Sequence, residues 1–224
     1  MAKDYSVFDV VGPNMIGPSS SHTAGAARLG KIALKIAGKP VKDVKFYLHG
    51  SFAETYKGHG TDKALVGGIL GFDTEDARIR DSFELAEKAG IKFEFIKVDL
   101  GEDTHPNTVK IEMTLEDKAI STIMGASIGG GNIKLTEMDG LSLDFNGSKA
   151  AVVLEVKDIP GAVSFVTGLL AHNNKDISMI STNKPVNSAH TFVTIETSDM
   201  LEDELVEQLR RFEVIAKVVV LDKF

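Results

Sequence analysis

The segment from residue 17 to residue 23 contains side chains that can bind an anion and move a proton. It reads Gly-Pro-Ser-Ser-Ser-His-Thr and precedes an apolar stretch with helical spacing. A helix N-terminus has unpaired N–H groups and partial positive charge, so it attracts a carboxylate or a phosphate. His22 can carry charge or shuttle a proton. The hydroxyl donors are Ser19, Ser20, Ser21 and Thr23. The alternative interpretation is a polar loop in which one serine caps the helix.

A second candidate is His59, which stands between two glycines just before an expected helix start at Thr61. An imidazole flanked by glycines is sterically open, and its pKa near neutrality suits a general base. The alternative is a loop histidine without a role. His49, at the end of an expected strand, is near enough in sequence to join this site. We favour for His49 a strand-end histidine whose hydrogen bonds are satisfied.

The Gly-rich segment from Ser127 to Asn132 has the order of neither a Walker loop nor a dinucleotide fingerprint. A turn or β-bulge is the favoured interpretation, with a direct ligand role as the weaker one. The histidines show no metal-ligand spacing, so we expect no metal site built by this chain alone. No G-x-S-x-G elbow is present, which argues against an α/β-hydrolase serine.

The composition narrows the function further. The 224 residues include no cysteine, which excludes a thiolate nucleophile and an iron–sulfur cluster held by this chain alone. A net charge of -7 argues against nucleic-acid binding. No apolar stretch approaches the length of a membrane span, and residues 1–6 lack the apolar core of a signal peptide. We therefore expect a soluble, cytoplasmic protein.

Turn residues at Asn146-Gly147-Ser148 predict a boundary between domains at 1–146 and 148–224. In the second domain we expect a strand at 150–156 and a helix that is opened by the Asp158–Gly161 turn and runs to Asn173. Strands at 177–181 and 189–195 around a turn at 185–188, a helix starting at Asp199 and a strand at 214–221 follow. This βαββαβ order is the ferredoxin-like arrangement.

The first domain is predicted to be mixed α+β, so the whole chain belongs to the α+β class. A helix capped by Ser21 or His22 should end at Ala37, before Gly38 and Pro40. The other expected helices cover 61–70 and 76–89. The expected strands cover 41–48, 91–95, 108–115, 119–128, 132–137 and 141–145.

The second domain offers its own candidate ligand site. Asp158 and Gly161 stand at a helix N-terminus, where N–H groups can bind a carboxylate and an acid can bind an ammonium. Asn173 and Asn174, after the same helix, are further polar candidates. The alternative is that this domain only pairs with another copy through an open sheet edge. The residues leave both interpretations open.

Residues 148–224, with Asp158-x-Pro160-Gly161 between strand and helix, resemble an ACT domain, an amino-acid-sensing ferredoxin-like module. The first domain closely resembles the β chain of the two-chain, iron–sulfur-dependent L-serine dehydratases. That resemblance is carried by the motifs at 17–23, at 58–62 (Gly-His-Gly-Thr-Asp) and at 127–131 (Ser-Ile-Gly-Gly-Gly). The first domain is also similar to the extra domain of some phosphoglycerate dehydrogenases, which binds regulatory anions.

The resemblance implies a lyase subunit that converts L-serine to pyruvate, a precursor for gluconeogenesis, and ammonia. It implies a [4Fe–4S] cluster ligated by cysteines of a partner α chain, with this chain inactive alone. Ser19–Thr23 would complete the substrate pocket at the subunit interface, with His59 as base or proton carrier and His22 beside it. An isolated chain would form a homodimer through the ACT domain. The rival interpretation is a non-catalytic amino-acid sensor that regulates another enzyme.

Overall fold

A computed structural model describes residues 14–185 and 188–223. The chain divides into two compact units, residues 1–140 and 141–224, which are considered separately below. The N-terminal residues examined for a signal peptide, 1–6, lie outside the described residues. So do Val186 and Asn187, the centre of the turn expected at 185–188.

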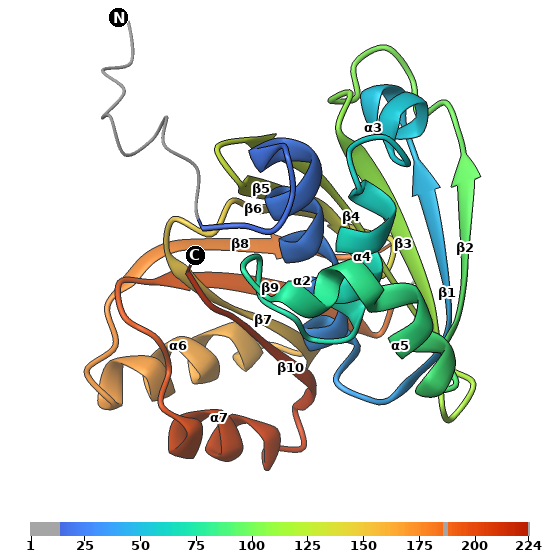
Figure 1. Ribbon diagram of the computed structural model, residues 1–224. Coiled ribbons are helices and arrows are strands. Elements are labelled where there is room, and N and C mark those ends of the chain that lie inside the picture. Colours follow the sequence, from blue (N-terminus) through green and yellow to red (C-terminus); the bar gives the residue numbers. More distant parts are fainter. Residues whose placement is uncertain (1–13, 186–187, 224) are drawn as a thin grey trace, which may run out of the picture. The chain divides into compact units, whose positions relative to one another are not determined.

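The first sheet has the strand order β2-β1-β3-β4-β5-β6 among the described residues (Figure 1). Strands β1 and β2 are parallel, whereas β3 pairs antiparallel with both β1 and β4, and β5 pairs antiparallel with β4. The strands are β1 (Val41–Leu48), β2 (Lys92–Lys97), β3 (Thr108–Leu115), β4 (Ile120–Gly129), β5 (Asn132–Met138) and β6 (Leu141–Phe145). Alternating buried residues on β1 and β3 supply the core face of this sheet.

Helix α2 packs on β4 and against α4 in this unit. The two helices approach closely because Gly30 and Gly68 face each other: a Cβ on Gly68 would lie 2.8 Å from Gly30 Cα. The helical elements are η1 (a π-helix, Ser20–Ala24), α2 (Gly25–Ala37), α3 (Gly50–Thr55), α4 (Thr61–Ile69), η2 (a 3₁₀-helix, Ala77–Asp81) and α5 (Ser82–Lys88).

Three features of the first unit differ from the sequence expectations. The helix is capped by Ser19, whose Oγ accepts from the His22 N–H, and not by Ser21 or His22. The short helix α3 was not expected, since its six residues begin with glycine and follow a strand directly. The helix expected at 76–89 is split into η2 and α5, because the Asp76 carboxylate caps a first, tighter turn.

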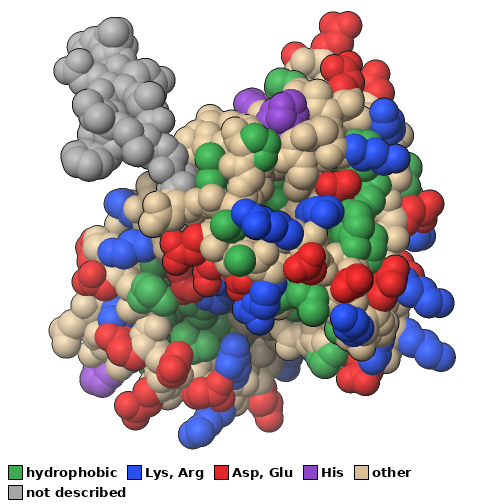
Figure 2. All heavy atoms as spheres, viewed as in Figure 1, with side chains coloured by type: hydrophobic (Ala, Val, Ile, Leu, Met, Phe, Trp, Pro, Cys, Tyr) green, Lys and Arg blue, Asp and Glu red, His purple; other side chains and the backbone are tan. Residues whose placement is uncertain are grey.

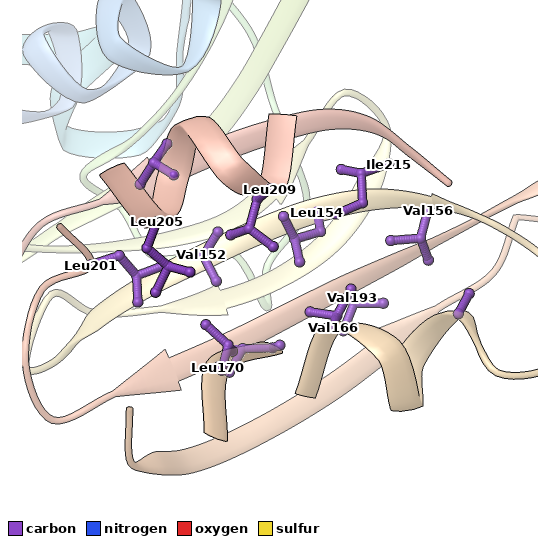
Figure 3. Close-up of a cluster of buried hydrophobic side chains, with 13 residues drawn as sticks. Val152, Leu154, Val156, Val166, Leu170, Val193, Leu201, Leu205, Leu209 and Ile215 are labelled. Carbon is purple, nitrogen blue, oxygen red and sulfur yellow. The ribbon is translucent and has the colours of Figure 1, made fainter. Parts of the chain in front are cut away.

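The second unit contains a four-stranded sheet with the order β10-β7-β9-β8, confirming the βαββαβ ferredoxin-like prediction. Figure 3 shows side chains of α6, α7 and the strands converging on one core, with Val166 and Leu170 from α6 and Leu205 and Leu209 from α7. The elements are β7 (Ala150–Lys157), α6 (Ala162–His172), β8 (Ile177–Asn183), β9 (His190–Thr197), α7 (Asp203–Arg210) and β10 (Ile215–Leu221).

One predicted helix start in this unit was wrong. Helix α7 begins at Asp203 with Glu202 as N-cap, because the carbonyl of Asp199 accepts the Thr197 hydroxyl and Leu201 is buried in the intervening turn. Helix α6 begins directly after the Asp158–Gly161 turn, as predicted, and its N-cap Gly161 has a φ of +87° that favours glycine.

The face drawn in Figure 2 carries charges of both signs. Figure 2 shows acidic and basic side chains interspersed over the face drawn. Among residues 14–185 and 188–223, no helix is both long and apolar enough to cross a bilayer.

Candidate active site

The ring of His22 is held by two serines from different elements. In η1, Ser19 Oγ accepts from the His22 backbone N–H at 3.2 Å and lies 3.4 Å from His22 Nδ1. The other ring nitrogen, Nε2, is 3.0 Å from Ser51 Oγ at the start of α3. The edge of the Phe52 ring packs against the imidazole, with ring centroids 5.3 Å apart. His22 is thereby fixed in position and orientation.

His59 lies beside His22, with a distance of 4.8 Å between the ring centroids. The loop that carries it is anchored at both of its peptide groups: His59 N donates to Thr55 O at 3.1 Å, and Thr23 Oγ1 donates to His59 O at 3.2 Å. Thus the hydroxyl next to His22 in the chain holds the backbone of the second histidine. The two motifs, 36 residues apart in the sequence, form one site.

Gly17 allows the loop before η1 to fold back onto Thr23. Its φ is +139°, and a Cβ at this position would lie 2.5 Å from Thr23 Cγ2. Any side chain would therefore push Thr23 away from the His59 carbonyl. The glycine at the start of the motif is a steric requirement of the histidine pair.

The site favours uncharged His22. Burial lowers the pKa of the His22 imidazole, and the charge of neighbouring His59 lowers it further. Because like charges in contact repel, a charge on His59 disfavours protonation of His22. Burial raises the pKa of Asp62, at the start of α4, although the Lys63 N–H donates to its carboxylate at 2.8 Å.

Several buried side-chain atoms of the first unit lack a hydrogen-bond partner among the described residues. They are His59 Nδ1, Thr61 Oγ1, Asn107 Oδ1 and Ser127 Oγ. Ser127 lies against the start of α2, since a Cβ on Gly25 would be 2.6 Å from Ser127 Cβ. Buried polar groups are nearly always paired, and exceptions often mark functional sites.

The remaining candidates of the first unit have defined places. Ser20, Ser21 and Thr23 lie in η1, with Thr23 buried and the two serines partly exposed. His49 is a satisfied strand-end histidine, because its Nδ1 accepts from Leu100 N at 3.1 Å. The Gly-rich segment forms the β4–β5 turn with the expected bulge. Arg28 of α2 donates to the Gly131 carbonyl of this turn at 2.7 Å.

Sequence reasoning missed Ser51 and Asn107. Ser51 contacts His22, which lies 29 positions away in the sequence, and no local sequence pattern predicts a contact over that separation. The only signal was its place after the strand-end His49-Gly50. Asn107 follows His105-Pro106 and directly precedes β3, and its backbone carbonyl accepts from Ser127 N at 3.0 Å.

The candidate residues of the second unit do not form one cluster within a chain. The Asp158 carboxylate accepts from Lys184 Nζ and, at 3.0 Å, from Thr191 Oγ1. Asn173 Nδ2 donates to Leu169 O at 2.9 Å, and Asn174 adopts a φ of +56°. Asp158 and Gly161 precede the 11-residue helix α6, while the two asparagines follow it, about 16 Å further along.

Comparisons with known proteins identify the family of this chain. Residues 6–94 match the family model described as serine dehydratase beta chain. The chain is 43% identical over 202 residues to an "L-serine dehydratase, beta chain" of Peptoniphilus asaccharolyticus, covering 90% of this chain and 91% of that protein. The chain belongs to the L-serine dehydratase beta-chain family. A family member of Bacillus subtilis (strain 168), named as a probable beta chain, is 40% identical over 95% of this chain and 96% of that protein.

A solved structure is similar to part of this beta-chain family member. It is the solution NMR structure of the ACT domain from GTP pyrophosphokinase of Chlorobium tepidum. The similarity covers 34% of this chain and 86% of that one, at 18% sequence identity and a TM-score of 0.28. A TM-score this low does not establish a shared fold, so the ferredoxin-like assignment rests on the strand order of the second unit.

The lowered pKa of His22 predicts a pH dependence of stability. The unfolded chain takes up a proton at His22 as the pH falls through the ordinary value of 6.5, while the folded site resists it. Stability due to neutral His22 is therefore present above that pH and lost below it. The midpoint of urea unfolding should fall between pH 7.5 and 5.5 less steeply in His22→Asn than in the wild type. Equal slopes in the two proteins would contradict the assignment.

Proposed function

We propose that this chain is the β subunit of an iron–sulfur L-serine dehydratase, which converts L-serine to pyruvate and ammonia. The observation that carries the proposal is the contact between the His22 and His59 rings, 4.8 Å apart, in a chain without cysteine. Two imidazoles framed by hydroxyls can position a small polar amino acid and accept its proton. The family membership supports the choice of L-serine.

In this proposal His59 removes the α-proton of L-serine. The ring of His22 cannot take this role as readily, because both of its nitrogens lie within hydrogen-bond distance of serine hydroxyls. The partly exposed Ser20 and Ser21, at the start of η1, would hold the substrate carboxylate. Loss of the hydroxyl group from the β-carbon then gives aminoacrylate, which tautomerises and is hydrolysed to pyruvate and ammonia.

The side chains of this subunit do not fit direct ligation of a [4Fe–4S] cluster, which takes cysteine thiolates. We propose that the partner α chain holds the cluster. Its chemistry would be that of a Lewis acid at the substrate hydroxyl. Hydroxyls and imidazoles, the donors that this chain does present, suit the substrate side of such a site. This division makes the chain inactive alone.

Anaerobic co-expression with the cognate α chain tests the proposal. Pyruvate formation from L-serine should require both chains, and the isolated β chain should give none. Activity of the isolated chain, or none from a correctly assembled pair with an intact cluster, would contradict the proposal. A purely regulatory role, the alternative, predicts that variants of His22 and His59 change the dependence on serine concentration and leave the maximal turnover intact.

We also propose that the second unit pairs with another copy of itself. Strand β8 is an edge strand whose side chains are largely exposed, including Met179 at 39% and Ile180 at 42%. An exposed edge presents unpaired N–H and C=O groups to a second strand. Light scattering of the isolated chain at micromolar concentration should give the mass of a dimer. A monomer would contradict the pairing.

A further inference from the structure

Contacts link Ser19, His22 and Ser51, and the direction of donation along them follows from the one bond whose donor is fixed. Ser19 Oγ accepts from the His22 backbone N–H at 3.2 Å, so its own proton is free to donate elsewhere. The nearest acceptor that its contacts provide is His22 Nδ1, at 3.4 Å. A neutral imidazole that accepts at Nδ1 carries its proton on Nε2. We assign this tautomer from the network, since both nitrogens can play either role.

The same direction of proton donation continues from His22 to Ser51 in α3. Nε2–H then donates to Ser51 Oγ at 3.0 Å, so the Ser51 hydroxyl keeps its own proton to give away. Ser51 is partly exposed, and the bond that Thr55 Oγ1 makes to this residue goes to its carbonyl, leaving the hydroxyl unaffected. Ser19, His22 and Ser51 thus donate in sequence, and the chain ends in a proton donor beside the His22–His59 pair.

This arrangement supplies what the proposed reaction needs on the leaving-group side. One base removes the α-proton, and the departing hydroxyl requires a proton to leave as water. We propose that Ser51 is a catalytic residue that donates this proton to the β-hydroxyl of L-serine. It regains a proton from His22, which in turn takes one from Ser19. This assignment rests on the proposed dehydratase function. His59 and Ser51 then act on opposite ends of the bond that becomes the double bond.

The step balances in protons and electrons. The electron pair of the Cα–H bond forms the new carbon–carbon double bond, and the proton of that bond goes to His59. The Cβ–O pair leaves with oxygen, which takes the Ser51 proton and departs as water. Ser51 recovers a proton from His22 Nε2, Nδ1 receives one from Ser19, and Ser19 is reprotonated by solvent. This leaves the His22 proton on Nδ1, and proton exchange with solvent restores the Nε2–H tautomer before the next turnover. Lowering of the His22 pKa by burial agrees with an imidazole that passes protons on while staying neutral.

The first test needs no cluster and no partner. Long-range proton–nitrogen NMR on the full chain labelled with ¹⁵N-histidine reports the protonation of each ring nitrogen of His22. We expect a protonated Nε2 and an unprotonated Nδ1, with mixed tautomers in Ser51→Ala. A wild-type Nδ1 that carries the proton would reverse the chain and overturn the relay, whatever the enzyme does.

The second test separates proton donation from a structural role in the assembled enzyme. With L-serine, Ser51→Ala should lower kcat roughly 100-fold or more, with little change in KM, as for loss of a general acid. With β-chloro-L-alanine, whose chloride leaves without a proton, turnover should stay at the wild-type level. Ser51→Thr should restore most of the activity, and Ser164→Ala, at an exposed position on α6, should leave both reactions unchanged.

Equal losses with both substrates would show that Ser51 only maintains the site, and would overturn the assignment. Full activity of Ser51→Ala with L-serine would overturn it as well. Failure of the proposed function would give a different result, because the wild-type complex would then turn over neither substrate. The tautomer of His22 could still be measured in the isolated chain.

Discussion

Replacing His59 with alanine in the assembled enzyme should lower kcat for L-serine by roughly 10²- to 10⁴-fold, the usual contribution of a general base. The imidazole is placed for this role by the Thr55 and Thr23 hydrogen bonds to its backbone, which an alanine keeps. Loss of activity should therefore come from lost chemistry and leave the position of the loop intact. Steady-state kinetics of the purified complex measure the effect.

The control is His172→Ala, because His172 is an exposed histidine in the last turn of α6 and has no part in the site. It should keep wild-type kcat and KM. The cluster content and the assembly of the His59 variant must equal those of the wild type for the comparison to count. Undiminished kcat in a fully assembled His59→Ala complex would remove His59 from the mechanism.

Gly68→Ala should reduce the free energy of unfolding by about 3 kcal/mol, near the upper end of overpacking effects. A Cβ at this position would lie 2.6 Å from Lys31 N and 2.8 Å from Gly30 Cα. These are backbone atoms, which cannot rotate away, so α2 and α4 would have to separate. Urea unfolding of the full chain, followed by circular dichroism, measures the loss.

The matched control is Gly168→Ala in α6, where an added Cβ meets no atom within 4 Å. Removing a glycine from a helix interior stabilises the helix by about 0.5–1 kcal/mol, so this variant should shift the midpoint upward. The glycine-to-alanine substitution should thus lower the stability at position 68 in α4 and raise it at position 168 in α6. A destabilisation of similar size at both positions would show that close helix packing is not the cause.

Much of the fold could be predicted because its strands and helices have strong local patterns. In β1, Val44, Phe46 and Leu48 alternate with partly exposed residues, and the predicted bounds are those observed. The errors fall at helix starts, where one hydrogen bond decides the boundary. The sequence predicts a helix start at Asp199, yet the Asp199 carbonyl accepts the Thr197 hydroxyl and α7 begins at Asp203.

The site could be predicted only in its motif residues. His22 and His59 were selected from their sequence surroundings, but their contact depends on the Thr23–His59 hydrogen bond between distant segments. Ser51 and Asn107 have ordinary neighbours and gain significance only when α3 and the end of the β3–β4 ladder meet η1. Long-range packing of this kind has no periodic signature in the sequence.

The lysine on Asp158 sets a condition on any regulation through the second unit. The Asp158 carboxylate already binds the ammonium of Lys184, which is tethered to the same chain, and this contact lowers the pKa of Asp158. A free amino acid whose ammonium seeks this carboxylate must displace a competitor whose effective concentration is on the order of millimolar. If a free amino acid binds here, Lys184 would raise the concentration needed for occupancy, and a Lys184→Met chain would bind it at lower concentrations.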